Sequence, residues 1–464
     1  MEICNAFHFL YEMQGDLQCI SFFVNNLKKF AMYFIFLQLN LKKFAMECKF
    51  VSVNGYICNG LHFLDMIERK QYISLLEKWK DKKVIKIVTG IRRCGKSSLL
   101  KMFCDKLQQD GVRKEQIQSV NFEDLDNEPL LDYKRLHSHI KERLLPDRMN
   151  YLFFDEIQLV GNFQKTIDSL FLLDNVDIYI TGSNAYLLSG EIATLLTGRY
   201  VEIKLFPFSF SEFIMASGKP QSLEQAYRQY VECGSFPYVT QICNDKEMVR
   251  EYLSGLYNTI VLKDVVGRKK ITDVMMLQSI VRFIADNIGN ISVIKRISDT
   301  LTSLGRKITS HTVENYISAL TDSFIFYQAQ RYDTKGKQLL KTGMKLYLAD
   351  IGLRNVINGT KGGDMGHILE NIVFLELARR GGEIYVGKAG EAEIDFVVIN
   401  GNDKAYYQVA LSVRDEATMN RELAPLKSLP DSFPKYLLTM DNDPVILHDG
   451  IKQIYVLDWL TERP

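Results

Sequence analysis

Two short segments carry residue types that together suit the binding of a nucleoside triphosphate and a divalent cation. Residues 90–97 read Gly-Ile-Arg-Arg-Cys-Gly-Lys-Ser and follow an apolar segment, Val84–Thr89. This spacing matches Gly-x-x-x-x-Gly-Lys-[Ser/Thr], a pattern that is informative between a strand and a helix. A second apolar segment, Tyr151–Phe154, ends in the carboxylates Asp155 and Glu156. The two segments predict that the chain binds a nucleoside triphosphate with Mg²⁺ and hydrolyses it. The segments leave the choice between adenine and guanine open, and ATP is the expected nucleotide because no motif resembles a guanine-reading one.

The residues of the first segment have distinct physical roles. Gly90 and Gly95 allow the backbone to curl so that N–H groups face a phosphate, and the start of the next helix adds positive field. Lys96 is expected to reach the outer phosphates, and the Ser97 hydroxyl suits Mg²⁺. The predicted nucleotide-binding residues are Gly90, Ile91, Arg92, Arg93, Cys94, Gly95, Lys96, Ser97 and Ser98, with the two arginines either over the phosphates or paired elsewhere.

The acidic pair at the second segment completes the predicted metal and catalytic site. Asp155 ends an almost wholly apolar strand, where its carboxylate would hold Mg²⁺ directly or through water. Glu156 would point in another direction and orient or deprotonate the attacking water. The alternative is a surface acidic pair, which the glycine-rich segment makes the weaker interpretation.

Two further residues are candidates for catalysis. Asn184 closes the next predicted strand in Thr-Gly-Ser-Asn, and the ends of parallel strands open on one edge of a sheet. It could therefore contact the γ-phosphate or the attacking water, or serve only the turn. Arg199 follows a predicted helix, Glu191–Thr197. It is a candidate cation for the transition state, in cis or toward a neighbouring subunit, or an exposed residue near a helix end.

Alternating apolar segments and amphipathic stretches predict a parallel α/β sheet. A stripe of apolar residues after Ser98 predicts a helix that ends at Gly111. Strands are expected at Val84–Thr89, Gln118–Phe122, Tyr151–Asp155, Ile178–Thr181 and Val201–Leu205.

The motifs at residues 89–97, 154–158, 181–184, 205–213 and 234–237 resemble those of the archaeal-type AAA ATPases of bacteria and archaea. The likeness covers about Met66 to Pro464. It implies a P-loop NTPase fold of the additional-strand, catalytic-glutamate type at 66–215, in which Glu156 activates water. A helical lid is expected at 216–272.

Residues 273–348 predict three helices followed by strands, the order of a winged helix-turn-helix whose third helix enters DNA. That helix, Ser310–Asp322, offers His311 and Asn315 but no arginine or lysine. Phosphate contacts would have to come from other residues, so DNA, a protein contact and a purely structural role remain alternatives. The candidate cations are Lys295, Arg296, Arg306, Lys307 and the lysines of the predicted wing.

Residues 349–464 resemble a degenerate restriction-endonuclease-like α/β domain. Such a site uses two carboxylates to hold a metal and a lysine to assist the nucleophile. Glu370 and Asp395 fit the carboxylates, but Gln408 and Ala410 stand where an acid and the lysine are expected. Nuclease activity is therefore disfavoured, with Lys388 as the one candidate replacement for the lysine.

Composition sets wider limits. The chain has 464 residues, 47% hydrophobic and 24% charged, and a net charge of +1, so a nucleic-acid surface would be a local patch. Eight cysteines without a CxxC pair indicate no disulfide framework and favour a reduced cytoplasmic setting. No apolar run reaches the roughly 18 residues that span a bilayer. Residues 1–65 form an extension of doubtful status, with the true start expected near Met66.

The resulting functional prediction is an ATPase whose cycle moves its C-terminal domains or a DNA or protein partner, including a second copy of the chain. Two alternatives remain open. One is a nucleotide-gated binding module with little turnover. The other is an ATP-dependent DNA-processing nuclease, which Gln408 and Ala410 disfavour.

Overall fold

The computed structural model describes residues 67–185, 198–218, 222–267, 269, 271–336, 338–359 and 364–462, without the side chains of Lys341 and Thr342. All of them belong to one compact unit, residues 65–464. The predicted extension at 1–65 and the predicted helix at 191–197 lie outside the described residues.

A five-stranded parallel sheet holds the two motifs. Its strands pair in the order β2-β3-β4-β1-β5, and each neighbouring pair is parallel. Strand β4 therefore separates the strand before the glycine-rich loop from the strand that carries the acidic pair, which confirms the additional-strand P-loop arrangement. The strands are β1 (Ile85–Thr89), β2 (Ile117–Asn121), β3 (Asn150–Asp155), β4 (Val176–Gly182) and β5 (Tyr200–Lys204).

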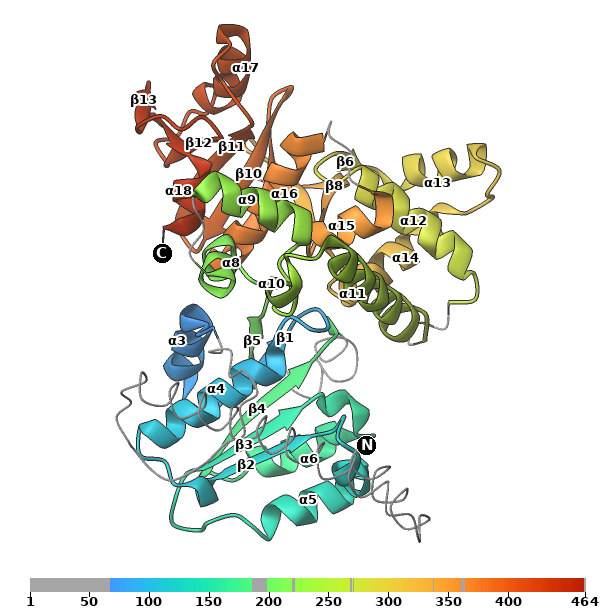
Figure 1. The fold of residues 1–464 in the computed structure, drawn as a ribbon, viewed down its shortest axis with the longest axis vertical. Coiled ribbons are helices and arrows are strands. Elements are labelled where there is room, and N and C mark those ends of the chain that lie inside the picture. Colours follow the sequence, from blue (N-terminus) through green and yellow to red (C-terminus); the bar gives the residue numbers. More distant parts are fainter. Residues whose placement is uncertain are drawn as a thin grey trace, which may run out of the picture. The chain divides into compact units, whose positions relative to one another are not determined.

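Helices cover both faces of this sheet (Figure 1). Because successive side chains in a strand point to opposite faces, Val88 and Phe153 pack with α3 (Lys70–Trp79) and α4 (Lys96–Gln109). Ile87 and Phe154 pack on the other face with α5 (Tyr133–Lys141) and α6 (Phe163–Phe171). Both layers are largely apolar, and the side chains of the two motifs lie at the carboxyl ends of the strands.

Short 3₁₀ turns lie at η1 (Lys114–Gln116), η2 (Leu125–Leu131) and η3 (Ile157–Leu159).

A run of helices follows β5, as the sequence predicts. Three of these helices begin at a side-chain cap, which satisfies backbone N–H groups of the first turn: Ser209 before α8, Ser222 before α9 and Asp245 before α11. The run ends in a π-helix, a form that is rare and frequent at functional sites. The elements are α8 (Phe210–Ser217), α9 (Leu223–Cys233), α10 (Val239–Ile242), α11 (Lys246–Thr259) and the π-helix η5 (Ile260–Gly267).

The three helices and the following strands predicted for residues 273–348 are present. They are α12 (Val274–Asp286), β6 (Ile291–Ser292), α13 (Ile294–Ser303), α14 (Ser310–Asp322), β7 (Phe326–Asp333) and β8 (Gln338–Leu348). Strands β7 and β8 pair as an antiparallel hairpin.

The remaining strands join this hairpin in one mixed sheet of nine strands, in the order β13-β14-β12-β11-β10-β9-β7-β8-β6. Strand β7 pairs in parallel with β9, so the sheet runs across the predicted boundary at residue 348. Helix α16 is buried along nearly its whole length. The elements are α15 (Ile351–Asn358), α16 (Met365–Arg380), β9 (Glu383–Ala389), β10 (Ala392–Asn400), β11 (Asp403–Ala410), α17 (Glu416–Lys427), β12 (Lys435–Thr439), β13 (Ile446–His448), β14 (Ile451–Tyr455) and α18 (Val456–Thr461).

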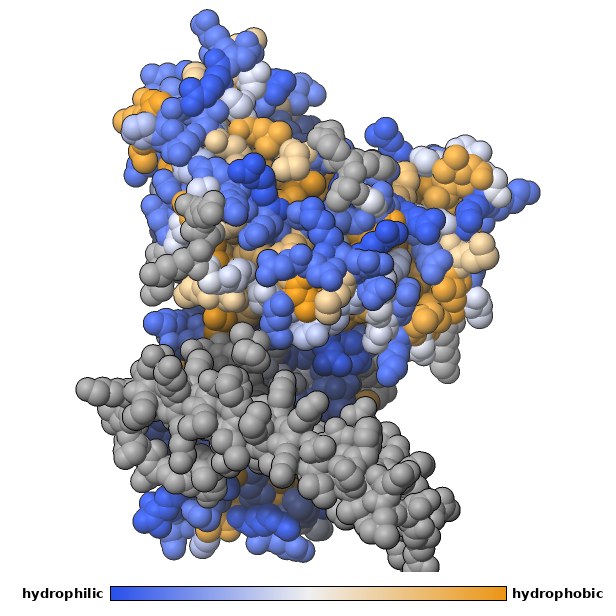
Figure 2. All heavy atoms as spheres, in the orientation of Figure 1, coloured by the Kyte–Doolittle hydropathy of each residue, from blue (hydrophilic) through white to orange (hydrophobic). Residues whose placement is uncertain are grey.

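Hydrophobic and hydrophilic residues alternate over the visible face, with an apolar group at β13 (Figure 2). Leu447 on β13, the edge strand of the nine-stranded sheet, and Val445 just before it are each 65% exposed. Within the described ranges, no helix has both the length and the apolar character needed to cross a bilayer.

Candidate functional site

The glycine-rich loop has a backbone that only these glycines allow. Gly90 has φ +151°, and a Cβ there would lie 2.1 Å from the Leu205 carbonyl oxygen. Gly95 has φ +102° and precedes α4 without a capping side chain. Because the first N–H groups of a helix have no partner within it, they remain available to an anion.

A buried arginine outside the motif supports this loop. Arg69 is 2% exposed, and its guanidinium donates to the carbonyl oxygens of Cys94 (3.2 Å) and Phe206 (3.0 Å). It also pairs with the Glu212 carboxylate at 2.8 Å. Arg69 therefore holds the glycine-rich loop in place through the Cys94 carbonyl oxygen. Its position in the sequence did not indicate this role.

Lys96 and Glu156 face each other across the site. The Lys96 ammonium lies 3.4 Å from Glu156 Oε1 and donates to the Gly90 carbonyl oxygen at 3.2 Å. Burial alone would raise the pKa of Glu156, but the Lys96 ammonium, a hydrogen bond from Gln158 and the nearby Arg92 outweigh it and lower the pKa. Glu156 is thus ionised at neutral pH and able to accept a proton.

Asp155 occupies the end of β3 with hydroxyl neighbours. Its Oδ1 accepts a hydrogen bond from Thr181 Oγ1 at 2.6 Å, and the same hydroxyl oxygen accepts from the Glu156 N–H at 2.8 Å. Burial raises the pKa of Asp155, while hydrogen bonds from Ser97 and Thr181 offset part of that rise. Ser97 and Asp155 thereby bring together oxygen ligands of the kind that Mg²⁺ prefers.

The remaining predicted catalytic residues separate into two groups. Ser183 and Asn184 follow β4 on the same sheet edge, both are buried, and Ser183 helps to lower the pKa of Glu156. Arg199 lies at the opposite edge, where its carbonyl oxygen accepts from the Ile85 N–H at 2.7 Å. The five residues of β1 span roughly 16 Å, and Arg199 pairs with Asp168 at 3.3 Å. The structure does not bring Arg199 to the site in cis, and a role toward a neighbouring subunit stays a prediction.

The four non-glycine residues between the two glycines of the loop also differ in orientation. Ile91 and Cys94 are fully buried in the core, so only their backbone can face a nucleotide. Arg93 is exposed. The Arg92 guanidinium contacts both Asp264 carboxylate oxygens at 3.0 and 3.2 Å and Glu123 Oε1 at 3.0 Å.

A cavity of about 530 Å³ opens over these residues, within the size range of ligand pockets. One wall is the loop and the sheet edge, including Lys96 and Glu156. The other wall comes from residues that sequence reasoning missed, because they follow β5 by a long stretch of chain. These are Pro237, Tyr238, Gln241 and Tyr252, and the Tyr238 and Tyr252 rings lie 4.9 Å apart.

Comparisons with known proteins agree with this geometry. The sequence profile of an AAA domain matches residues 82–214, which hold the loop, the acidic pair and the parallel sheet. An uncharacterized protein of Haemophilus influenzae is 40% identical over 402 residues, covering 86% of this chain and 99% of that protein. The chain belongs to the archaeal-type AAA family of P-loop ATPases.

Other similarities extend beyond the AAA domain. A domain of unknown function matches residues 224–364. An uncharacterized protein of Methanocaldococcus jannaschii is 31% identical over 359 residues, covering 73% of this AAA protein and 77% of the relative. The Walker-type ATPase of Pyrococcus abyssi has 18% identity and a TM-score of 0.42, covering 65% of this chain and 99% of that one.

The AAA protein carries a second cluster of charges in its nine-stranded sheet. The Lys345 ammonium on β8 lies 2.8 Å from Glu370 Oε1, 2.7 Å from Glu393 Oε1 and 3.4 Å from Asp395 Oδ1. Tyr347 also donates to Glu370 Oε1 at 2.6 Å. The carboxylates predicted as metal ligands are therefore paired with a lysine of the chain itself.

Lys345, rather than Lys388, supplies the cation of this cluster. Glu370 and Asp395 both pair with Lys345, whereas Lys388 lies on β9 opposite Glu393. Gln408 accepts from the Asp395 N–H at 3.4 Å and donates to Glu422 at 2.9 Å. Among the described residues, no group of three or more His, Cys, Asp or Glu side chains is arranged to hold a metal ion.

The surface predicted to meet DNA has mixed charge. His311, Glu314, Asn315 and Ser318 are exposed on α14, so a carboxylate shares the face that would approach phosphates. Lys295, Arg296 and Lys307 are exposed on and after α13. DNA binding therefore stays a prediction that would depend on α13 and its following loop.

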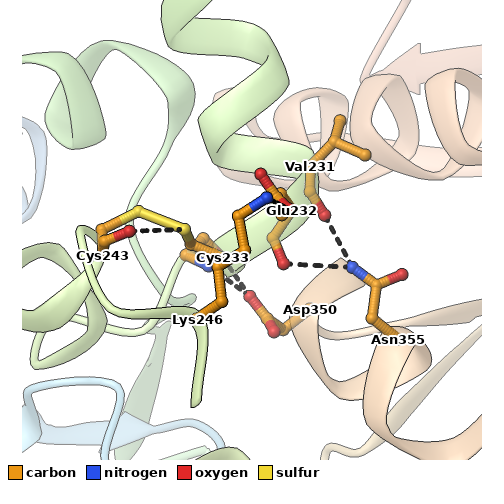
Figure 3. Close-up of a disulfide and its surroundings, with 8 residues drawn as sticks. Val231, Glu232, Cys233, Cys243, Lys246, Asp350 and Asn355 are labelled. Carbon is orange, nitrogen blue, oxygen red and sulfur yellow. Dashed lines mark hydrogen bonds and ion pairs between the residues drawn. A yellow bond between two sulfur atoms is a disulfide. The ribbon is translucent and has the colours of Figure 1, made fainter. Parts of the chain in front are cut away.

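A disulfide joins Cys233 at the end of α9 to Cys243 just after α10 (Figure 3). The cysteine pattern of the sequence predicted no disulfide framework, and a spacing of ten residues is no motif from which this pair could be predicted. Nearby, the Asn355 side chain donates to the Val231 carbonyl oxygen at 2.8 Å, and Ser235 Oγ donates to Asp350 Oδ2 at 2.6 Å. The disulfide thus lies where α9 meets α15.

Proposed function

We propose that this protein binds ATP with Mg²⁺ in the 530 Å³ cavity and hydrolyses it. The observation that supports this most is the convergence of Lys96, Ser97, Asp155 and Glu156 at one sheet edge. A cation, a hydroxyl, a metal-binding carboxylate and an ionised acid are the groups that phosphoryl transfer to water requires.

The contacts suggest how the residues act. An incoming γ-phosphate competes with Glu156 for the Lys96 ammonium, which now lies 3.4 Å from that carboxylate. Release of Lys96 leaves Glu156 free to orient water and accept its proton. The N–H groups at the start of α4 hold phosphate oxygens. Ser97 and Asp155 would hold Mg²⁺, which neutralises the charge that develops on the phosphates.

The direct test is phosphate release from ATP by the purified chain, measured with Mg²⁺ and with EDTA. Metal-dependent turnover supports the proposal. Tight MgATP binding without turnover would instead support the nucleotide-gated binding module.

Replacing Lys96 tests the phosphate contact. Lys96→Ala removes a charged donor that is worth about 1.5–3 kcal/mol, so we expect MgATP affinity to fall roughly ten- to hundredfold. Calorimetric titration measures the change. Lys101→Ala, which alters an exposed lysine of the same helix, should bind as the parental protein does, and equal binding by both variants would contradict the assignment.

We further propose that Arg92 couples the nucleotide to the C-terminal half. Its guanidinium lines the cavity and at the same time contacts Asp264 in η5 at 3.0 Å. Asp264 is 2% exposed, so a shift of Arg92 toward phosphate oxygens would alter a buried contact of that π-helix. Movement of the C-terminal domains, or of a bound DNA or protein partner, would follow from this change.

Arg92→Ala tests the coupling. Loss of two charge-assisted hydrogen bonds should weaken the local stability of residues 260–267 by roughly 1–3 kcal/mol, and ATP should no longer change their amide exchange. Hydrogen exchange followed by mass spectrometry measures both effects. Arg93→Ala removes a neighbouring exposed cation and should leave exchange in η5 unaltered. An unchanged ATP response in Arg92→Ala would refute the coupling.

A further inference from the structure

The two cysteines of the disulfide lie at the ends of a segment that forms one wall of the cavity. Their Cα atoms are 5.9 Å apart, within the range that a disulfide spans. Pro237, Tyr238 and Gln241 lie between them and line the cavity. A covalent link between the cysteines therefore closes a loop that carries three residues of the candidate nucleotide site.

The N-terminal part of this segment is held independently of the disulfide. Ser235 Oγ donates to Asp350 Oδ2 at 2.6 Å, and its carbonyl oxygen accepts from the Phe208 N–H at 2.8 Å. Phe236 is fully buried. These contacts fix the chain up to Pro237 in either redox state.

The C-terminal part has one fully buried side chain, Val239, but its residues that line the cavity are more exposed. Helix α10 has only four residues, and helices this short are marginal by themselves. Tyr238 is 46% exposed and Gln241 is exposed, so burial adds little to hold them. Val239 anchors α10 in the core, and the link at Cys243 adds a covalent restraint close to the exposed side chains that line the cavity.

We propose that Cys233 and Cys243 form a reversible thiol–disulfide site that controls nucleotide binding, with a small-molecule disulfide such as glutathione disulfide as the oxidant. This inference rests on the proposed function of the cavity. In the disulfide-linked state, Tyr238 and Gln241 are ordered before the nucleotide binds. In the reduced state, these two residues become ordered only when the nucleotide binds. Pre-ordering of side chains at a site raises affinity.

The exchange balances in two steps. Cys243 is half-buried whereas Cys233 is 3% exposed, so the Cys243 thiolate attacks one sulfur of the small disulfide and releases one thiol. The Cys233 thiolate then attacks Cys243 Sγ in the mixed disulfide and releases the second thiol. The two cysteines lose two electrons and two protons, and the small disulfide becomes two thiols. A dithiol reductant reverses both steps.

The free cysteines of the described residues are poor competitors for the oxidant. Burial raises the pKa of the Cys94 thiol, and it raises the pKa of Cys104 to about 12. Since the thiolate is the attacking species, both are slow to react at neutral pH.

The test compares affinity for a non-hydrolysable ATP analogue with Mg²⁺ after treatment with glutathione disulfide and after reduction. Calorimetry measures affinity, and peptide mapping identifies the linked cysteines, including any that involve Cys4, Cys19, Cys48 or Cys58. We expect a Cys233–Cys243 link in the oxidised protein and about tenfold tighter binding than in the reduced protein. The double variant Cys233→Ser/Cys243→Ser should bind as the reduced protein in both conditions, and Cys104→Ser should respond as the parental chain does.

Two results would overturn the inference and leave the proposed function intact. One is equal affinity in the two states once mapping has shown the link, and the other is absence of the link after oxidation. If neither the oxidised nor the reduced protein binds the ATP analogue, the cavity is not a nucleotide site, and both the proposed function and the redox control are wrong.

Discussion

Glu156→Gln should lower ATP hydrolysis by roughly 10²- to 10⁴-fold, the usual contribution of a positioned general base. The amide has nearly the size of the carboxylate but cannot take a proton from water. It also removes the partner that lies 3.4 Å from the Lys96 ammonium, which leaves the lysine to the phosphates. MgATP affinity should therefore be retained or rise while turnover is lost, as measured by calorimetry and phosphate release.

The matched control is Glu123→Gln, a second carboxylate that lines the cavity and contacts Arg92 rather than Lys96. Its turnover should stay within a few-fold of the parental rate. Parental turnover in Glu156→Gln would show that another group activates the water.

Lys345→Met should cause the largest loss of stability among the variants considered. The ammonium is 3% exposed and lies among three carboxylates. Removing one partner of a buried ionic group costs about 3–5 kcal/mol. Calorimetric melting at pH 8 should therefore show a lower transition temperature than the parental protein.

The pH dependence of this loss follows from the cluster. Burial raises the pKa of Asp395 to about 7, and the opposing charge of Lys345 outweighs burial to lower the pKa of Glu370. As the pH falls from 8 to 5.5 the Asp395 carboxylate gains a proton, so fewer buried negative charges are left without Lys345 and the difference between variant and parent should shrink. The pairing of Glu370, whose pKa is lowered, is lost only at more acidic pH and does not change over this range. Lys388→Met on β9 should change the free energy of unfolding by no more than about 0.5 kcal/mol relative to the parent. A similar loss in both variants would contradict a specific role for Lys345.

Much of the nucleotide site could be predicted because local sequence determines it. Gly90 and Gly95 mark the positions where the backbone curls, because glycine adopts such conformations without strain. Asp155 stands at the end of an apolar strand that is visible in the sequence. Parallel strands then bring Ser97, Asp155, Glu156 and Asn184 to one edge, because the carboxyl ends of such strands coincide.

The other wall of the cavity could not be predicted, because it depends on packing between distant segments. Tyr238 and Tyr252 reach the cavity through α10 and α11, and Arg69 reaches the loop from a helix before it. The sequence left open whether Arg199 acts in cis or toward a neighbouring subunit, because the order of the strands had to be known before the edge that carries this residue could be assigned. Lys345 was overlooked because its strand joins the second sheet through the pairing of β7 with β9.

Titration of the purified chain with MgATP in a calorimeter tests the central claim most directly. The account predicts one saturable site on each chain, dependent on Mg²⁺ and weakened roughly ten- to hundredfold by Lys96→Ala. Absence of binding, or binding that Lys96→Ala leaves unchanged, would show that the loop and the acidic strand end do not form a nucleotide site.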